Sequence, residues 1–270
     1  MEGLCFDRKG DLWFCSIYES RVLKLDMKKR TAEEVFRREG FAPVAVKIHK
    51  DGRVLVCGIG RGAPGGIVIM QPDGSMQRDL VVDRDVDDLV FDSDGGFYYT
   101  WITGSVNAPT GAVCYVSPDF SSDTVYIDHL AMPNGVALSR DEKRLWITEL
   151  TGGRLLNFPS RKGSGVSSVC YCFTGRDGPD SCSIDAGDNL YVAMYGQGRI
   201  MIFNAYGFPV GQVLIPNRDK GHFLCSSHAV VRPHTRELYI CAADDIGDEG
   251  AWIFKAEGLA VGHDKSYQFL

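Results

Sequence analysis

The sequence predicts an all-β fold, a six-bladed β-propeller of four-stranded antiparallel blades around a central tunnel. A polar or small residue, an apolar run, a turn often built on Asp and Gly, and a second β-rich run follow one another six times. These units begin at Glu2, Val44, Asp87, Asn134, Asp180 and Ser227. Successive starts lie 42, 43, 47, 46 and 47 residues apart, and no long helical pattern interrupts them. A period of this length, with strand and turn chemistry in every unit, is typical of a propeller.

The first two strands of each unit are expected to be short and buried on both faces. Apolar residues occur in runs, as at residues 54–56 and 190–193, which is the pattern of strands packed between two neighbouring layers. Tight turns such as Asp51-Gly52 and Asp73-Gly74 separate the runs. A third strand recurs in all six units, at residues 21–25, 66–70, 112–116, 154–158, 199–203 and 251–254.

The longest connection between a second and a third strand is in unit three, at residues 101–111. We expect this loop to overhang the tunnel mouth and to shape what enters. The unbroken repeat predicts a single domain over residues 1–270. Ring closure usually pairs an N-terminal strand with the last blade, whereas here only Met1 precedes the first inner strand. Either residues 258–270 complete the last blade, or the closing N-terminal strand is missing.

Composition limits the classes of partner. A net charge of −6 and the lack of a long Lys and Arg run argue against a nucleic-acid surface. No stretch approaches the ~20 apolar residues of a membrane span, and the first residues lack the basic and then apolar segments of a secretory signal. The nine cysteines are an odd number and several lie in strand patterns. We therefore expect reduced thiols and a cytoplasmic protein of unknown oligomeric state.

The first residues of the units define a candidate metal site, because equivalent positions of a propeller converge around its axis. Four of them are the carboxylates Glu2, Asp87 and Asp180 and the amide Asn134. Buried carboxylates placed together lose hydration and repel one another, and a bound cation relieves both penalties. Oxygen donors without His or Cys favour a hard ion such as calcium or magnesium over zinc. Alternatively, these residues only cap turns at strand ends.

Longer segments resemble a known family. They are MEGLCFDRKGDLWF, KIHKDGRVLVC, VDDLVFDSDGGFYYT, VSPDF, NGVALSRDEKRLWITE, GPDSCSIDAGDNLYVAMYGQGR and the IP-R-GH stretch around Ile215. Together they cover nearly the whole chain, and GPDSCSIDAGDNLYVAMYGQGR is a specific match. The chain resembles the family of senescence marker protein, gluconolactonase and luciferin-regenerating enzyme, and within it the bacterial drug-responsive lactonases.

The resemblance implies a hydrolase that opens small-molecule lactones at a divalent cation, commonly calcium, with magnesium, manganese and zinc as alternatives. The family's cation ligands fall on Glu2, Asp87, Asn134, Asp180 and Ser181. A cation there would polarise the ester carbonyl, and the resemblance assigns Asp180 as the general acid or base. The alternative is a calcium-binding propeller that binds a small molecule or a protein partner without turnover.

Two residues and one stretch of the chain bear on how far the family pattern applies here. Trp101 stands where these lactonases often carry an Asp, so it either re-lines the substrate cavity or packs between blades. The stretch between Met76 and Val86 is shorter than in the drug-responsive lactonases, so their second calcium site is not expected here. His228 lies at the same end as the column of first residues, where it either binds substrate or has a structural role.

Overall fold

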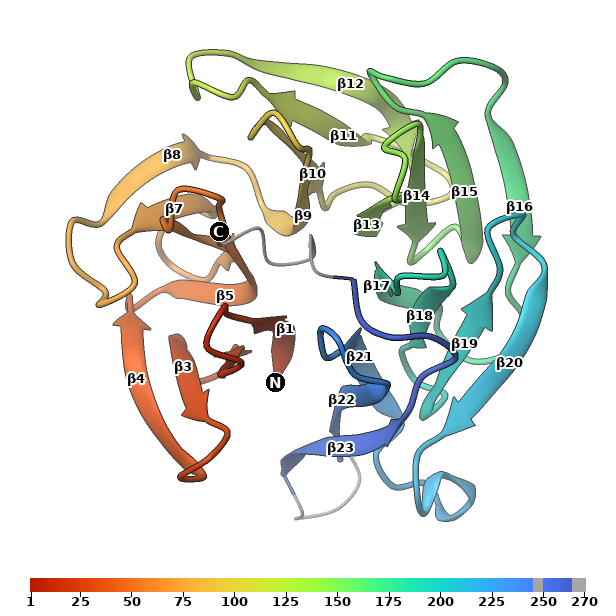
Figure 1. Cartoon of the computed structure of the whole chain (residues 1–270). Coiled ribbons are helices and arrows are strands. Elements are labelled where there is room, and N and C mark those ends of the chain that lie inside the picture. The colour runs from red at the N-terminus through yellow and green to blue at the C-terminus, as the bar shows by residue number, and fades with distance from the viewer. Residues whose placement is uncertain (245–249, 264–270) are drawn as a thin grey trace.

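The computed structural model describes residues 1–244 and 250–263. Six antiparallel sheets surround a common centre (Figure 1), so the predicted six-bladed propeller is confirmed. The described residues form β-strands and one short 3-10 helix, η1 (Arg218–Lys220). In this part of the chain, no helix has the length and apolar character needed to cross a membrane.

The blades follow the chain in order around the ring. Blade one holds β1 (Glu2–Phe6), β2 (Leu12–Ser16), β3 (Arg21–Asp26) and β4 (Thr31–Arg37). Blade two holds β5 (Phe41–Ile48), β6 (Val54–Gly60), β7 (Gly66–Met70) and β8 (Arg78–Val82). Blade three holds β9 (Val86–Phe91), β10 (Phe97–Trp101), β11 (Gly111–Val116) and β12 (Asp123–Leu130).

The second half of the ring repeats this arrangement. Blade four holds β13 (Pro133–Leu138), β14 (Arg144–Glu149), β15 (Arg154–Pro159) and β16 (Ser168–Cys172). Blade five holds β17 (Pro179–Ile184), β18 (Leu190–Met194), β19 (Arg199–Phe203) and β20 (Pro209–Leu214). Blade six holds β21 (Cys225–Val231), β22 (Glu237–Ala243) and β23 (Ala251–Glu257). Each predicted third strand is present, as β3, β7, β11, β15, β19 and β23.

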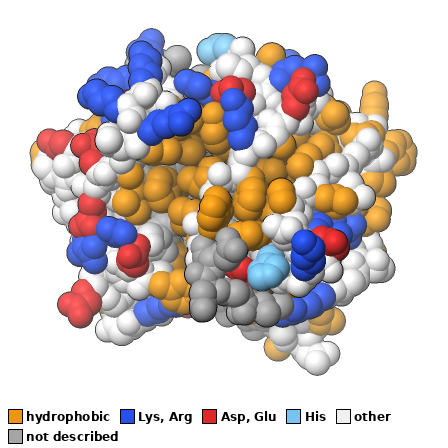
Figure 2. All heavy atoms as spheres, turned by 90° about the horizontal axis from the view of Figure 1, so that it is seen from below, with side chains coloured by type: hydrophobic (Ala, Val, Ile, Leu, Met, Phe, Trp, Pro, Cys, Tyr) orange, Lys and Arg blue, Asp and Glu red, His pale blue; other side chains and the backbone are white. Residues whose placement is uncertain are grey.

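Blade six has three strands within the described residues, and β23 is its outermost strand. Residues 258–263 do not extend this sheet, because Gly262 forms only isolated bridges with Asp185 and Pro233. The described part of the C-terminal segment therefore does not complete the blade, and residues 264–270 lie outside the description. Hydrophobic side chains gather on the side of the molecule where blades one and six lie (Figure 2), and Trp252 of β23 is 51% exposed.

The core lies between neighbouring blades, as the apolar runs predict. Every residue of β7 and β18 is buried, whereas the outer strand β20 is mostly exposed. One cluster joins Leu4 of blade one to Val46 of blade two and Tyr239 of blade six. Blade one thus packs against both neighbours, and burial of each such side chain contributes roughly 1.5–3 kcal/mol. Seven of the nine cysteines are buried.

In the Asp and Gly turns between first and second strands, an Asp carboxylate accepts hydrogen bonds from backbone N–H groups of the turn. In blade three, Asp92 Oδ1 accepts hydrogen bonds from the backbone N–H groups of Gly95 and Gly96, both at 2.9 Å. Gly95 has φ of 98°, a conformation that favours glycine. In blade five, fully buried Asp185 caps the equivalent turn and accepts a hydrogen bond from the Tyr191 hydroxyl at 2.8 Å. These carboxylates lie at the ends of the inner strands away from the column.

Candidate functional site

All six inner strands carry a β-bulge at the column of first residues. In each bulge, the inner strand has one residue more than the facing stretch of its neighbour. The bulges run from Glu2 to Cys5, Pro43 to Ala45, Val86 to Leu89, Pro133 to Val136, Pro179 to Cys182 and Ser226 to His228. Every residue of the predicted column lies within one of them. Bulges redirect side chains and are frequent beside active sites, so the repeat places its polar residues where the backbone departs from the regular ladder.

Two buried threonines form hydrogen bonds within two of these six bulges. The Thr100 hydroxyl accepts a hydrogen bond from the Asp88 N–H at 3.0 Å and donates one to the Asn134 carbonyl at 2.6 Å. Thr148 repeats this pattern one blade further on, because its hydroxyl accepts from the Gly135 N–H at 2.8 Å and donates to the Asp180 carbonyl at 2.6 Å. Each threonine thus fixes its own bulge and the column residue of the next blade.

Replacement of Thr148 by Val should destabilise the protein by about 1–3 kcal/mol, because the change leaves a buried N–H and a buried carbonyl without their partner. Thr148 is fully buried, so water cannot replace the lost hydroxyl. Urea unfolding measures the effect. Thr124→Val on the exposed strand β12 is the matched control and should change stability by less than about 0.5 kcal/mol. Equal stability of the two variants would contradict the proposed role of Thr148.

The five predicted ligands lie in four of these bulges, and the charges of Glu2, Asp87 and Asp180 act on one another. Asp87, Asn134, Asp180 and Ser181 are at most 5% exposed, and Glu2 is half-buried. The Ser181 hydroxyl donates to Asn134 Oδ1 at 3.5 Å across two blades. Burial raises the pKa of Glu2 to about 7. Burial and the charges of Glu2 and Asp87 hold the pKa of Asp180 well above its usual range, and burial and the charge of Glu2 do the same for Asp87.

The donor atoms of this cluster are carboxylate, amide and hydroxyl oxygens, which suit a hard cation. Within the described part of the chain, no group of three or more His, Cys, Asp or Glu side chains is positioned to hold a metal ion. Mutual repulsion between the carboxylates of Glu2, Asp87 and Asp180 opposes such a close arrangement. One carboxylate oxygen beside the cluster, Asp88 Oδ2, is buried and has no hydrogen-bond partner among the described residues. The chemistry of the donors thus fits a hard cation, while the side chains do not form a preassembled cage.

A second polar layer lies next to this cluster, and the sequence reasoning missed most of it. Asp88, 1% exposed, forms an ion pair with Lys47 Nζ at 3.0 Å through Oδ1. His228 is 1% exposed, and neither ring nitrogen has a hydrogen-bond partner among the described residues. Burial, together with the charge of Lys47, holds the pKa of His228 well below its usual range, so its ring is neutral. The Asp87-Asp88 pair of carboxylates was the signal that could have identified this layer.

Trp101 packs between blades two and three. Its side chain lies against the cluster that joins these blades, and the Arg84 guanidinium stacks over its ring at 5.0 Å from the centroid. Trp101 also lines an open pocket of about 860 Å³ with Ile102 and Thr103 of the long loop. The alternative that Trp101 packs between blades is therefore confirmed, and its place in the substrate cavity stays a prediction.

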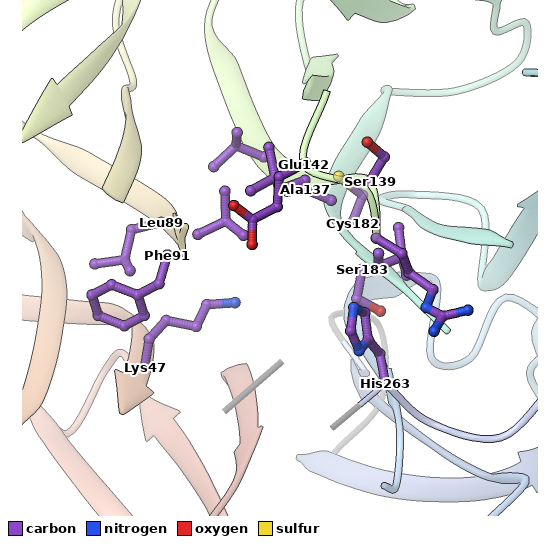
Figure 3. Close-up of a pocket in the computed structure, with 14 residues that line it drawn as sticks. Lys47, Leu89, Phe91, Ala137, Ser139, Glu142, Cys182, Ser183 and His263 are labelled. Atoms are coloured by element: carbon purple, nitrogen blue, oxygen red, sulfur yellow. The ribbon is translucent and has the colours of Figure 1, made fainter. Parts of the chain in front are cut away.

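A second pocket, of about 610 Å³ and open to solvent, lies at the other ends of the inner strands (Figure 3). Its walls include Leu89, Phe91 and Ala137, and Ser139 and Glu142 come from the turn that follows β13. These residues follow the column residues of their strands, so the pocket and the carboxylates lie towards opposite ends of the tunnel. The Lys47 side chain points from β5 into this central space.

The fold is a six-bladed propeller with acidic residues at the start of its inner strands, and known proteins share this architecture. The chain belongs to the SMP-30/Gluconolactonase/LRE-like family, whose defining region matches residues 1–244. It is similar to Lactonase drp35 of Staphylococcus saprophyticus, with 47% identity over 280 aligned residues that cover 100% of this chain and 86% of the relative. Lactonase drp35 of Staphylococcus aureus MRSA252 is 44% identical over the same shares.

Solved structures share the fold. A luciferin-regenerating enzyme superposes with a TM-score of 0.80 at 17% identity, over 99% of this chain and 94% of that chain. A gluconolactonase from Xanthomonas campestris superposes with a TM-score of 0.73 at 21% identity, over 93% of this chain and 84% of that chain. The family that the sequence motifs resembled is therefore confirmed, and at these identities the structural likeness concerns the fold alone.

Proposed function

We propose that this protein hydrolyses small-molecule lactones at a divalent cation bound by Glu2, Asp87, Asn134, Asp180 and Ser181. The observation that carries the proposal is the set of three carboxylates on the bulges of the inner strands, two buried and one half-buried, with the pKa of each raised. The lactonases that are 44–47% identical to this chain support the reaction class. Calcium is the first candidate ion because all donors are oxygens, and magnesium, manganese and zinc are the alternatives.

The bound ion would supply Lewis-acid polarisation of the ester carbonyl. In this ligand set, Asn134 and Ser181 are neutral oxygen donors. The three carboxylates carry the negative charge that would balance a divalent ion. Ionisation of Glu2, Asp87 and Asp180 costs free energy in the absence of a cation, since their pKa values are raised. A divalent ion held by Glu2, Asp87 and Asp180 would offset the repulsion between their ionised carboxylates.

We assign the proton transfer to Asp180. Its Oδ1 accepts a hydrogen bond from the Ser181 N–H at 2.9 Å, and Thr148 fixes its backbone carbonyl. A water oxygen attacks the lactone carbonyl carbon, and Asp180 accepts a proton from that water. The acyl C–O bond of the ring then breaks and Asp180 returns the proton to the leaving alkoxide oxygen, which yields a hydroxy acid. The reaction balances, because water and the lactone together contain all the atoms of the hydroxy acid and Asp180 ends in its starting protonation state.

Metal removal tests the proposal. Protein stripped with a chelator should open aliphatic and aromatic lactones at least tenfold more slowly than the same protein after calcium, magnesium, manganese or zinc is returned. Calorimetric titration of each ion into the stripped protein shows whether binding and turnover rise together. Cation binding without turnover of any lactone would favour a binding platform over an enzyme. Full activity in the stripped protein would contradict the role proposed for the ion.

A further inference from the structure

Lys47 brings a positive charge to the edge of the acidic cluster. Its side chain is only 14% exposed, and its Nζ lies 3.0 Å from Asp88 Oδ1. Asp88 directly follows Asp87, one of the proposed ligands, on the bulge of β9. The charge of Lys47 also acts on Asp87 itself, where it opposes the upward shift of the pKa that burial and neighbouring carboxylates cause. The Lys47 ammonium therefore affects the ionisation of Asp87 as well as pairing with Asp88.

Only one of the two Asp88 carboxylate oxygens has a partner among the described residues. Asp88 Oδ1 is shared between Lys47 and the Leu89 N–H, which donates at 2.8 Å, while Asp88 Oδ2 has no partner in the described part of the chain. Four carboxylates carry charge in this region: Asp180 feels those of Glu2 and Asp87, Asp87 feels those of Glu2 and Asp88, and Glu2 feels that of Asp88. Lys47 offsets one of these four charges, and a divalent ion would have to bind in the presence of that ammonium.

We propose that Lys47 is a built-in counter-charge that lowers the affinity of the acidic cluster for its divalent cation, so that the ion binds reversibly instead of permanently. This inference rests on the proposed function, because it concerns the same cation. Two charges of like sign held in a buried region repel strongly. Lys47 thus stabilises the cation-free protein and competes electrostatically with the ion.

A purely structural role for Lys47 predicts the opposite result. If the ammonium mainly held Asp88 and the β9 bulge in place, its removal would disorder Asp87 and weaken cation binding. Repulsion by Lys47 instead predicts tighter binding after its removal. The direction of the change in the dissociation constant therefore separates the two roles, and it does so without any measurement of catalysis.

The test is calorimetric titration of calcium into metal-stripped wild-type protein and the Lys47→Met variant. Lys47→Met should bind calcium about tenfold more tightly, since methionine keeps much of the side-chain volume and removes the charge. Lys24→Met is the matched control, because Lys24 is 18% exposed and pairs with Asp7 and Asp11 at 3.3 and 3.5 Å. The control should leave calcium affinity within about twofold of the wild type.

Lys47→Met leaves Asp88 buried without its cation, which is costly for folding. Asp88→Asn and the double variant Lys47→Met/Asp88→Asn avoid this problem. Asp88→Asn should weaken calcium binding about tenfold, and the added Lys47→Met change should restore most of that loss. Unchanged or weaker binding on removal of Lys47 in both backgrounds would overturn the inference alone. If wild-type protein bound no divalent ion, the proposed function would fail and this inference with it.

Discussion

Asp180→Asn should lower kcat for lactone opening roughly a thousandfold at saturating calcium, because an amide cannot accept and return the proton that ring opening requires. The substitution keeps the size of the side chain and one oxygen for the cation. The Thr148 hydroxyl donates to the backbone carbonyl of residue 180, and the Ser181 N–H, which donates to Asp180 Oδ1, can donate equally to the amide oxygen of Asn. Steady-state kinetics at several calcium concentrations, with calorimetric affinity on the same preparation, measures the effect.

Two control variants separate proton transfer from cation binding and from stability. Asp87→Asn removes charge from the proposed ligand set without a proposed proton-transfer role, so its activity should recover when the calcium concentration is raised. Asp185→Asn alters a fully buried carboxylate at the other end of the same blade, where it caps a turn, and should lower Tm while kcat remains near the wild-type value. Recovery of Asp180→Asn at high calcium would contradict the role of Asp180 as a base.

The sequence predicted the propeller because its period depends on local chemistry. Apolar runs and Asp-Gly turns recur in every unit, and the predicted third strands agree with the observed strands to within a few residues. The column of polar residues was also predictable, since equivalent positions on inner strands must meet around the axis. The clustering of Glu2, Asp87 and Asp180 follows from that symmetry alone and requires no knowledge of side-chain conformation.

Other features depend on contacts between blades, which the repeat does not encode. The Lys47–Asp88 ion pair joins the inner strands of blades two and three, and neither residue begins a unit. Thr100 and Thr148 are the next-to-last residues of β10 and β14, and in the sequence they are ordinary apolar-strand neighbours. Their role depends on each hydroxyl reaching a backbone carbonyl of the next blade. The bulges escaped prediction because one extra residue per inner strand does not alter the apolar pattern.

The metal-stripped protein should lose stability as pH rises from about 6.5 to 8.5. The pKa of Glu2 is raised to about 7, and the pKa values of Asp87 and Asp180 are also raised, by burial first and by like charges second. A folded-state pKa above the unfolded value adds stability that is complete at low pH and is lost as pH rises through the folded pKa. The window starts at 6.5 because the lowered pKa of buried His228 has the opposite effect below that pH.

We expect Tm of the stripped protein to fall by roughly 5–10 °C across this window. Excess calcium should remove most of the decline, because the ion binds the ionised carboxylates of the folded state and stabilises it by about 2.7 kcal/mol at a hundredfold excess over Kd. Differential scanning calorimetry with and without calcium gives both curves, and Asp87→Asn, with one carboxylate fewer, should show a shallower decline. A stripped protein whose Tm stays constant or rises over this range would show that the three carboxylates do not repel one another in the folded state, and the physical argument for the cation would fail.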